Sequence, residues 1–397
     1  MDASIYSLRL RDLLVLCVMS LLLLGVLMVQ SASTRLESIS GDGWDWTSTG
    51  VKQMLLGVGA LVVFFAVGFS DYRVLVRKPA LSWGNPLCWF YAITVLLCVA
   101  TLIPGVGHSV NGARRWLVLG PVQVQPSELA KWSVILVLAW VLAYDARVRE
   151  KFGRFLLLCA VVAVPALLIV VQDFGTAALV GLAGLLVMLV GRVKLWHVGV
   201  LLPLVLGLAA WFVMHKAYRL RRMTSFMNPF EDSRGEGYHM VQSLLSFSSG
   251  GVLGKGLGNG VQKLGYLPED TTDFIFAVVC EELGLFGALL TIVLFLGIGF
   301  VGWQVIKGKE AGSGGGGVAS DPFARLMVFG VTVMVSLQAL INVAVATVSV
   351  PTKGMSLPLV SAGGSGLLIT AGALGLVYSV ARLQEREADP VGLAAVV

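Results

Sequence analysis

The chain has 397 residues, of which 57% are hydrophobic and 13% are charged, and its formal net charge is +6. A soluble domain usually has about a quarter charged residues, so this composition excludes an ordinary soluble domain and indicates an integral membrane protein. The basic residues are scattered over short segments between apolar runs, which argues against a nucleic-acid-binding surface.

Uncharged apolar runs, taken in chain order, predict about ten membrane-crossing helices. A helix needs about 20 residues to cross the hydrocarbon core, so the longer runs must also contain loop or re-entrant parts. The runs are residues 13–34, 53–70, 86–113, 132–144, 155–172, 174–191, 195–215, 283–306 with an upstream extension to 273, 326–352 and 354–381. Merging the two runs around Asp173 would give nine helices. We therefore expect an all-α integral membrane protein with one polytopic domain over residues 1–397.

The distribution of basic residues predicts how these helices are oriented. With both termini in the cytoplasm, 16 of the 29 Lys and Arg residues fall in short cytoplasmic segments and six fall in short outer segments. The other seven lie in one long loop, and long loops do not report orientation. We expect cytoplasmic termini, a flexible cytoplasmic linker at residues 311–320, and the long loop on the outer side of the membrane.

The first two outer polar stretches contain candidate helix starts. Pro126 followed by Ser127 and Glu128 is typical of a helix N-terminus. Glu128 and Lys131 are three residues apart and share a helix face, so a cap with a local ion pair explains them as well as a binding role does. Helix 132–144 is long enough to cross the membrane only if these two charged residues lie in it or at its edge. Asp173 lies in a short turn between two apolar runs and is typical of a helix cap.

The third outer stretch is a long loop at residues 216–272, between the seventh and eighth predicted helices. Arg219, Arg221 and Arg222 follow the seventh helix, where they either anchor to lipid headgroups or clamp a diphosphate with their planar guanidinium groups. The glycines of residues 248–260 could offer backbone N–H groups to a phosphate, but they lack Walker or Rossmann spacing.

The fourth outer stretch, residues 351–365, contains two prolines and three glycines that break a helix at membrane depth. Irregular backbone is tolerated there only when it lies against protein or lines a water-filled cavity. The stretch therefore predicts the wall of a cavity.

Acidic residues are concentrated in residues 266–284. Glu269, Asp270 and Asp273 lead into a long apolar helix that carries Glu281 and Glu282. Acids at membrane depth are costly and usually functional, although a solvated loop with an acidic pair at a helix end is the simpler alternative. A helix that starts near Asp273 would place Glu281 on the same stripe, about 12 Å deeper, and turn Glu282 away. This arrangement predicts a cavity that opens outward.

Five motifs that occur in the same order resemble the SEDS family (shape, elongation, division, sporulation) of membrane glycosyltransferases. They are N-G-A-R-R-W-L at 111–117, Q-P-S-E-L-A-K at 125–131, Q-D-F-G-T at 172–176, G-L-G-N-G-V-Q-K-L at 256–264 and Y-L-P-E-D-T-T-D-F-I-F at 266–276. The G-N-G-V-Q-K motif and P-T-K-G-M-S-L-P-L-V-S at 351–361 are more similar to the division branch, FtsW, than to the elongation branch, RodA. Two positions depart from the family pattern: Thr271 replaces a usual His, and Ala362 replaces a usual Tyr.

The resemblance implies an inverting peptidoglycan glycosyltransferase that polymerises lipid II on the outer face of the membrane during septal synthesis, with Asp273 as the catalytic base. It implies that Arg219, Arg221, Arg222, Lys353 and Arg115 bind the diphosphate, and that Glu128, Lys131, Asp173, Glu281 and Ser361 shape the substrate cavity. No residue cluster specifies a metal site, although a divalent cation, Mg²⁺ or Mn²⁺, could share the charge of the diphosphate. The partners implied are a class B penicillin-binding protein (an FtsI-like transpeptidase) and other divisome membrane proteins.

Three alternatives stay open at this stage: an elongation polymerase like RodA, a lipid II flippase, and a division scaffold. A flippase needs headgroup contacts at both membrane faces, whereas the polar motifs here crowd onto one face. A scaffold needs no acid at Asp273. Polymerisation of lipid II by the purified protein would separate these alternatives.

Overall fold

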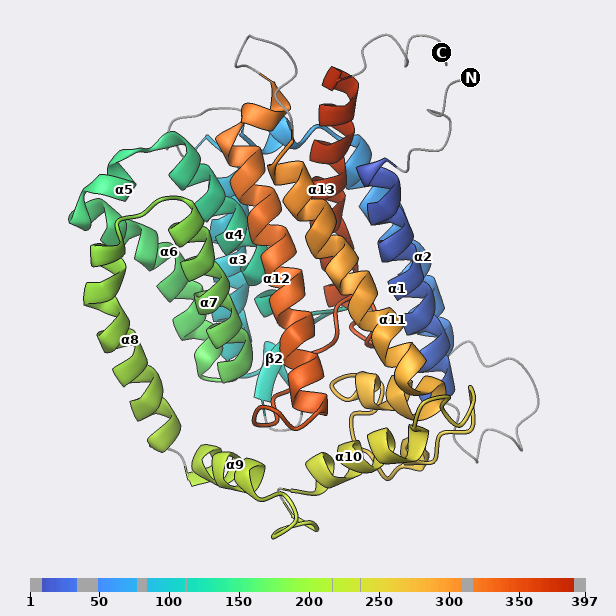
Figure 1. Ribbon diagram of the computed structural model, residues 1–397. Coiled ribbons are helices and arrows are strands. Elements are labelled where there is room, and N and C mark those ends of the chain that lie inside the picture. Colours follow the sequence, from blue (N-terminus) through green and yellow to red (C-terminus); the bar gives the residue numbers. More distant parts are fainter. Residues whose placement is uncertain are drawn as a thin grey trace, which may run out of the picture.

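The computed structural model describes residues 9–33, 49–76, 84–110, 113–120, 122–215, 217–235, 237–308 and 317–388. Long apolar helices run roughly side by side and form a bundle (Figure 1). Among the described residues, eight helices are long and apolar enough to cross a membrane, which identifies a multi-pass membrane protein. They are α1 (Leu10–Ser33), α2 (Thr49–Phe69), α4 (Pro126–Tyr144), α6 (Phe152–Val170), α8 (Leu195–Met214), α11 (Ile275–Ile306), α12 (Pro322–Ala346) and α13 (Ser365–Ala388).

Two further apolar helices, α3 (Pro86–Leu102) and α7 (Phe174–Val190), have 17 residues each. A helix therefore lies at each of the ten predicted positions, while the number of membrane crossings stays a prediction. Short elements complete the bundle: η3 (Tyr72–Val76), α5 (Arg147–Glu150) and η5 (Val318–Ser320). Of the linker predicted at residues 311–320, only residues 317–320 are among the described residues.

Helix α4 lies in the middle of the bundle, with nearly all of its residues buried, whereas His197 is the buried residue of α8, at the edge (Figure 1). Close backbone approach fixes part of this packing. A Cβ at Gly375 of α13 would lie 2.5 Å from the carbonyl oxygen of Phe64 in α2, so only glycine permits this approach.

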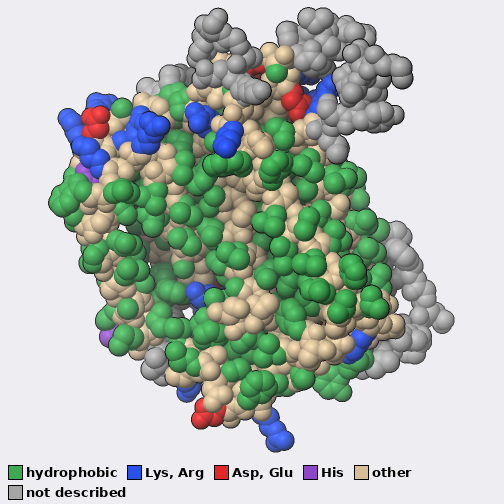
Figure 2. Space-filling model, in the orientation of Figure 1, with side chains coloured by type: hydrophobic (Ala, Val, Ile, Leu, Met, Phe, Trp, Pro, Cys, Tyr) green, Lys and Arg blue, Asp and Glu red, His purple; other side chains and the backbone are tan. Residues whose placement is uncertain are grey.

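Apolar side chains cover the middle of the molecule, while charged side chains gather at its two ends (Figure 2).

The first turn of α1 and the last turns of α13 share one end of the bundle, because Arg11 Nε lies 3.1 Å from Glu385 Oε2. The opposite end holds the starts of α4, α7, α11 and α13, and the predicted outer polar stretches lie there (Figure 1). The helices thus bring motifs that are far apart in the sequence to one face of the molecule.

The all-α architecture is confirmed, but a small antiparallel sheet follows α3, where the sequence predicts the end of a helix. Its strands are β1 (Gly107–Val110), β2 (Ala113–Leu119) and β3 (Val122–Val124), in the order β1-β2-β3. The predicted helix 86–113 ends at Leu102 instead. Residues 107–124 carry few charges and therefore pass as helix in a hydropathy window, although two apolar runs separated by Asn-Gly are a recognised hairpin signal. Val110 and Ala113 are indeed paired across the two intervening residues.

The long loop at 216–272 contains two helices, α9 (Ala217–Met227) and α10 (Tyr238–Gly250), and a short turn, η4 (Gln262–Leu264). Helix α10 packs against the start of α11, and α9 leads to it from the end of α8 (Figure 1). The loop therefore covers the end of the bundle where the polar motifs lie.

Candidate functional site

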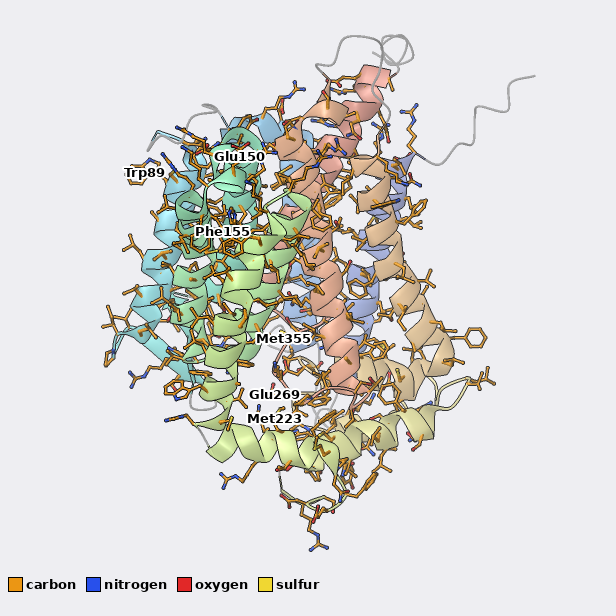
Figure 3. The ribbon with its side chains drawn as sticks, turned by 60° about the vertical axis from the view of Figure 1, so that its left-hand side comes forward. Trp89, Glu150, Phe155, Met223, Glu269 and Met355 are labelled. Atoms are coloured by element: carbon orange, nitrogen blue, oxygen red, sulfur yellow. The ribbon has the colours of Figure 1, made fainter. Side chains whose placement is uncertain are left out.

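The candidate site lies where the turn before α11, the segment between α12 and α13, the start of α7 and strand β2 meet. Glu269 from the turn, Met355 from the segment and Met223 from α9 lie at this end in Figure 3, while Trp89, Glu150 and Phe155 lie toward the other. We call residues 351–364, between α12 and α13, the broken segment. As predicted, these residues form no helix before Ser365.

Asp273 lies in a turn that directly precedes α11, two residues before the helix starts. The Phe274 N–H donates to the carbonyl oxygen of Glu269 (3.1 Å), which closes the turn. Asn342 of α12 donates from Nδ2 to the carbonyl oxygens of Asp273 (2.8 Å) and Met355 (2.7 Å). One buried amide thus ties the turn that bears the carboxylate to the broken segment.

Ser361 adds a second tie between these two elements. Its hydroxyl donates to the carbonyl oxygen of Thr272 and accepts from the Leu357 N–H at 2.7 Å. The Ala362 N–H donates to the carbonyl oxygen of Thr271 at 2.9 Å. Ser361 is buried, so this structure gives it a positioning contact with the backbone beside Asp273.

The broken segment approaches the Asp273 side chain closely. A Cβ at Gly354 would lie only 2.9 Å from Asp273 Oδ2, so a larger residue there would displace the carboxylate. Burial raises the pKa of Asp273 to about 7, and the nearby charges of Glu269 and Asp173 raise it further than Arg115 and Arg222 lower it. A carboxylate with a pKa near neutrality is suited to accept a proton from a substrate.

Two of the predicted cationic side chains, Arg115 and Arg222, lie close enough to Asp273 to lower its pKa, and Lys353 directly precedes Gly354, which packs against the carboxylate. Arg115 of β2 donates to the carbonyl oxygen of Gln172 (2.7 Å from Nη2), and its Nη1 lies 3.5 Å from Asp173 Oδ2. Lys353 Nζ lies over the ring of Phe174, 4.7 Å from the centroid. Arg222 donates to the carbonyl oxygen of Thr352 at 3.4 Å. Arg221 is exposed on α9, and Arg219 lies in the same helix, where its side chain is outside the described residues.

The expectation that Asp173 caps a helix is confirmed. Its Oδ1 accepts from the Thr176 N–H (3.1 Å) and its Oδ2 from the Thr176 hydroxyl (2.9 Å), at the start of α7. Because Arg115 also lies against this carboxylate, Asp173 connects the helix start to strand β2.

The expected pair of Glu128 and Lys131 is present and deeply buried. Lys131 Nζ lies 2.8 Å from Glu128 Oε2, and the Lys131 side chain is 1% exposed. It also donates to Gln338 Oε1 (2.7 Å), and Gln338 Nε2 donates to the carbonyl oxygen of Ser356 (2.9 Å). A chain of polar contacts therefore runs from α4 through α12 to the broken segment. Helix α4 starts at Pro126, as predicted, and includes both charged residues.

The predicted placement of Glu281 on the Asp273 stripe is wrong. Glu281 and Glu282 are both fully buried, and both face the glycine-rich loop that follows α10. Glu281 pairs with Lys255 (2.7 Å) and Glu282 with Lys263 (2.8 Å). Neither carboxylate is turned away from the protein or aligned along an open cavity. The misplacement follows from treating α11 as an isolated helix, because a loop distant in sequence folds over both acids.

The glycine-rich loop does offer backbone N–H groups to anions, but the anions are these two internal carboxylates. The N–H groups of Val261 and Gln262 donate to Glu281 (3.0 and 3.1 Å), and those of Gly258 and Gly260 donate to Glu282 (3.1 and 3.3 Å). Successive backbone N–H groups form such anion-binding concavities. Their occupation by carboxylates excludes the same groups from binding a phosphate in this conformation.

A cavity of about 480 Å³ adjoins the Asp273 turn and is lined by Arg221, Arg222, Asp232, Gly235, His239 and Thr352. His239 was not predicted as a site residue, nor were Gln338 and Asn342. The two amides are four residues apart in an apolar helix, so they lie on one face, and this spacing is the signal that would have identified them. His239 has no comparable sequence signal, because α10 folds back onto the site.

The described residues contain no group of three or more His, Cys, Asp or Glu side chains that could hold a metal ion. The side chains at the site therefore do not fit a dedicated metal centre, and we derive no catalytic step through one. The five cysteines, Cys17, Cys88, Cys98, Cys159 and Cys280, are free thiols.

The family of cell cycle proteins that comprises FtsW, RodA and SpoVE matches residues 11–386 of the chain. The probable peptidoglycan glycosyltransferase FtsW of Coxiella burnetii is 36% identical over 370 residues, which cover 93% of this chain and 95% of the relative. The probable peptidoglycan glycosyltransferase FtsW of Nitrosococcus halophilus is 42% identical over 287 residues, which cover 72% of each chain.

Two solved structures share the fold. One is a chain from a structure described as the structural coordination of polymerization and crosslinking by a peptidoglycan synthase complex. Its TM-score is 0.70 and its sequence identity 26%, and the match covers 94% of this chain and 97% of that one. The other is the rod shape determining protein RodA of Thermus thermophilus, with a TM-score of 0.61, 26% identity, and coverage of 93% and 95%.

Proposed function

Because this chain belongs to the FtsW, RodA and SpoVE family of cell cycle proteins and is a septal peptidoglycan glycosyltransferase, we propose that Asp273 is its catalytic base and lipid II its substrate. The observation that carries the proposal is the environment of Asp273. Its carboxylate has a pKa of about 7, lies against the broken segment, and has Arg115 and Arg222 nearby. Glycosyl transfer from a lipid diphosphate needs a base for the acceptor hydroxyl and positive charge for the leaving diphosphate, and these residues can supply both.

In the proposed reaction, the 4-hydroxyl of the acceptor N-acetylglucosamine loses its proton to Asp273. The hydroxyl oxygen forms a bond to the anomeric carbon of the donor N-acetylmuramic acid with inversion. The bond from that carbon to the diphosphate oxygen breaks, and its electron pair stays on the departing lipid diphosphate. General-base assistance of this kind contributes about 10²–10⁴-fold to the rate. Asn342 and Ser361 hold the backbone of the turn that bears the carboxylate, and Gly354 leaves room for the carboxylate beside the broken segment.

The leaving diphosphate requires positive charge at the headgroup level, because its tail stays in the bilayer. Arg222, which lies near both Asp273 and Thr352, is in the best position to supply that charge, with Arg221 on the same helix and Lys353 on the broken segment. The fold likeness to a peptidoglycan synthase complex supports a transpeptidase partner. We propose that this partner is a class B penicillin-binding protein and that other divisome membrane proteins join the assembly.

Replacing Arg222 with Lys is expected to reduce turnover by about tenfold to a hundredfold, because Lys offers a point charge where Arg offers a planar pair of donors. The same change at Arg219 and Arg221 tests which guanidinium contacts the diphosphate most directly. Lipid II polymerisation at matched expression is the measurement. If all three Lys variants keep full turnover, these residues only anchor the helix to lipid, and Lys353 or a divalent cation must stabilise the leaving group.

We propose that the end of the bundle that carries Asp273 faces the periplasm and that both termini face the cytoplasm, as the basic residues predict. In a chain that lacks its five native cysteines, Ser248→Cys on the exposed end of α10 should react with a membrane-impermeant thiol reagent added outside. Ala146→Cys, exposed at the opposite end, should react only after the membrane is opened. Reaction of both positions from the same side would refute this orientation.

A further inference from the structure

The cavity of about 480 Å³ beside the Asp273 turn contains a residue that the mechanism above does not use, His239. The cavity is bounded by α9 through Arg221 and Arg222, by the first turn of α10 through His239, and by the broken segment through Thr352. Arg222 donates to the carbonyl oxygen of Thr352, one residue before Lys353. The cavity wall is therefore continuous with the segment that touches the carboxylate of Asp273.

The position of the His239 ring is fixed by stacking. It lies parallel to the ring of Phe274, with an interplanar angle of 5° and centroids 6.0 Å apart. Phe274 directly follows Asp273, so His239 packs on the residue next to the proposed base. Nδ1 of His239 is buried, and the residue lines the cavity.

We propose that His239 binds the diphosphate of the glycosyl donor as an imidazolium, donating from Nε2 in the cavity that it shares with Arg221 and Arg222. This inference rests on the proposed function and names a further substrate-binding residue at the same site. The charge of the cavity wall is the reason for a phosphate ligand, since two guanidinium groups line it together with His239 and only one carboxylate, Asp232. Phosphate oxygens are the acceptors that such donors bind best.

The charge on His239 depends on the groups that face it. An imidazole gains or loses a proton near neutral pH, so nearby charge decides which form is present. A diphosphate in the cavity brings negative charge and favours the imidazolium, so binding of the donor is linked to protonation of His239. Three charged residues line the same cavity: Arg221 and Arg222 on α9, and Asp232 after it. Tyr238 packs beside the imidazole, and Glu269 and Asp273 belong to the turn that leads to Phe274, on which the ring stacks. Lys353 follows Thr352, which also lines the cavity.

The same contact assists bond cleavage. When the bond from the anomeric carbon to the diphosphate breaks, its electron pair adds charge to the phosphate oxygen. A hydrogen bond from the imidazolium then becomes stronger in the transition state than in the bound donor, so it raises turnover as well as affinity. His239 gives up no proton in this step and acts only as the imidazolium. Because alkaline pH removes the proton from the imidazolium of the donor complex, turnover should decrease there.

The test measures turnover of lipid II polymerisation against pH in wild type, His239→Gln and His239→Phe, with Asp273→Asn as a reference. The Phe variant keeps the stacking on Phe274 and removes the N–H donor. At pH 7 both His239 variants should lose about tenfold to a hundredfold in turnover, the range expected for a hydrogen bond to a charged group. Above pH 9 the wild type should decrease to the level of the variants. Wild-type turnover in His239→Phe, or a loss that is the same at every pH, would overturn the proposal.

A binding measurement on the wild type keeps the proposal testable if the variants do not fold. Farnesyl diphosphate serves as the probe, and its affinity should weaken by about tenfold or more between pH 7.5 and 9.5, where its own charge is constant. An unchanged affinity over this range would refute the role of His239. If Asp273→Asn is inactive while both His239 variants retain full turnover, the proposed function stands and only this inference fails.

Discussion

Asp273→Asn is expected to reduce glycan polymerisation by about 10²–10⁴-fold, the usual contribution of a general base. The amide nearly keeps the shape of the side chain, and the ties that hold this turn run through the backbone carbonyl oxygens of Asp273 and Thr272. The protein should therefore fold and insert normally. The loss should appear in turnover more than in the affinity for lipid II, because the carboxylate acts in the transition state.

The matched control is Asp270→Asn, which removes the same charge from the same turn three residues away. This variant should keep most of its activity. Polymerisation of lipid II by purified protein, analysed by product length and initial rate, is the measurement. If Asp273→Asn forms strands at the wild-type rate, another residue must accept the proton.

Lys131→Met is expected to cost about 3–5 kcal/mol of stability, because it leaves the buried carboxylate of Glu128 without its partner. Lys131 is 1% exposed and joins Glu128 to Gln338, whose amide holds the carbonyl oxygen of Ser356. Activity should fall with stability, because the broken segment loses one of its anchors beside Asp273. The thermal unfolding midpoint in detergent and the polymerisation rate are the two measurements.

The double variant Glu128→Gln with Lys131→Met separates charge from packing. It removes both charges, and an uncharged pair of similar volume often costs little in a buried site. Stability should recover in part relative to Lys131→Met alone. If the double variant is less stable than Lys131→Met, the carboxylate of Glu128 has a role of its own that the ion pair does not explain.

Local features were predictable from the sequence. The start of α4 at Pro126, the cap at Asp173 and the ion pair of Glu128 with Lys131 each depend on residues within four positions of one another. The break between α12 and α13 was also predictable, because two prolines and three glycines cannot continue an apolar helix. Such features follow from short-range backbone chemistry, which the order of the residues specifies directly.

Long-range features were not predictable in the same way. Glu281 and Glu282 are buried by a loop whose lysines precede them by about 20 residues. The pattern of residues in α11 does not show that this loop packs over the helix. The stacking of His239 on Phe274 also depends on how α10 returns to the bundle. The small sheet was missed for another reason, since an uncharged β-hairpin and an apolar helix have similar hydropathy. A prediction of cavity-lining residues from one helix alone therefore fails where a distant loop covers that helix.

The central claim, that Asp273 accepts a proton in the rate-determining chemistry, is tested most directly by the pH dependence of kcat/KM for lipid II. Burial raises the pKa of Asp273 to about 7, and only the deprotonated carboxylate can act as a base. We therefore expect kcat/KM to fall about tenfold for each pH unit below 7, whereas an ordinary Asp, with a pKa of about 3.9, would lose activity only in strong acid. A profile that stays flat from pH 5 to pH 7 in a folded enzyme would contradict the assignment of Asp273 as the base.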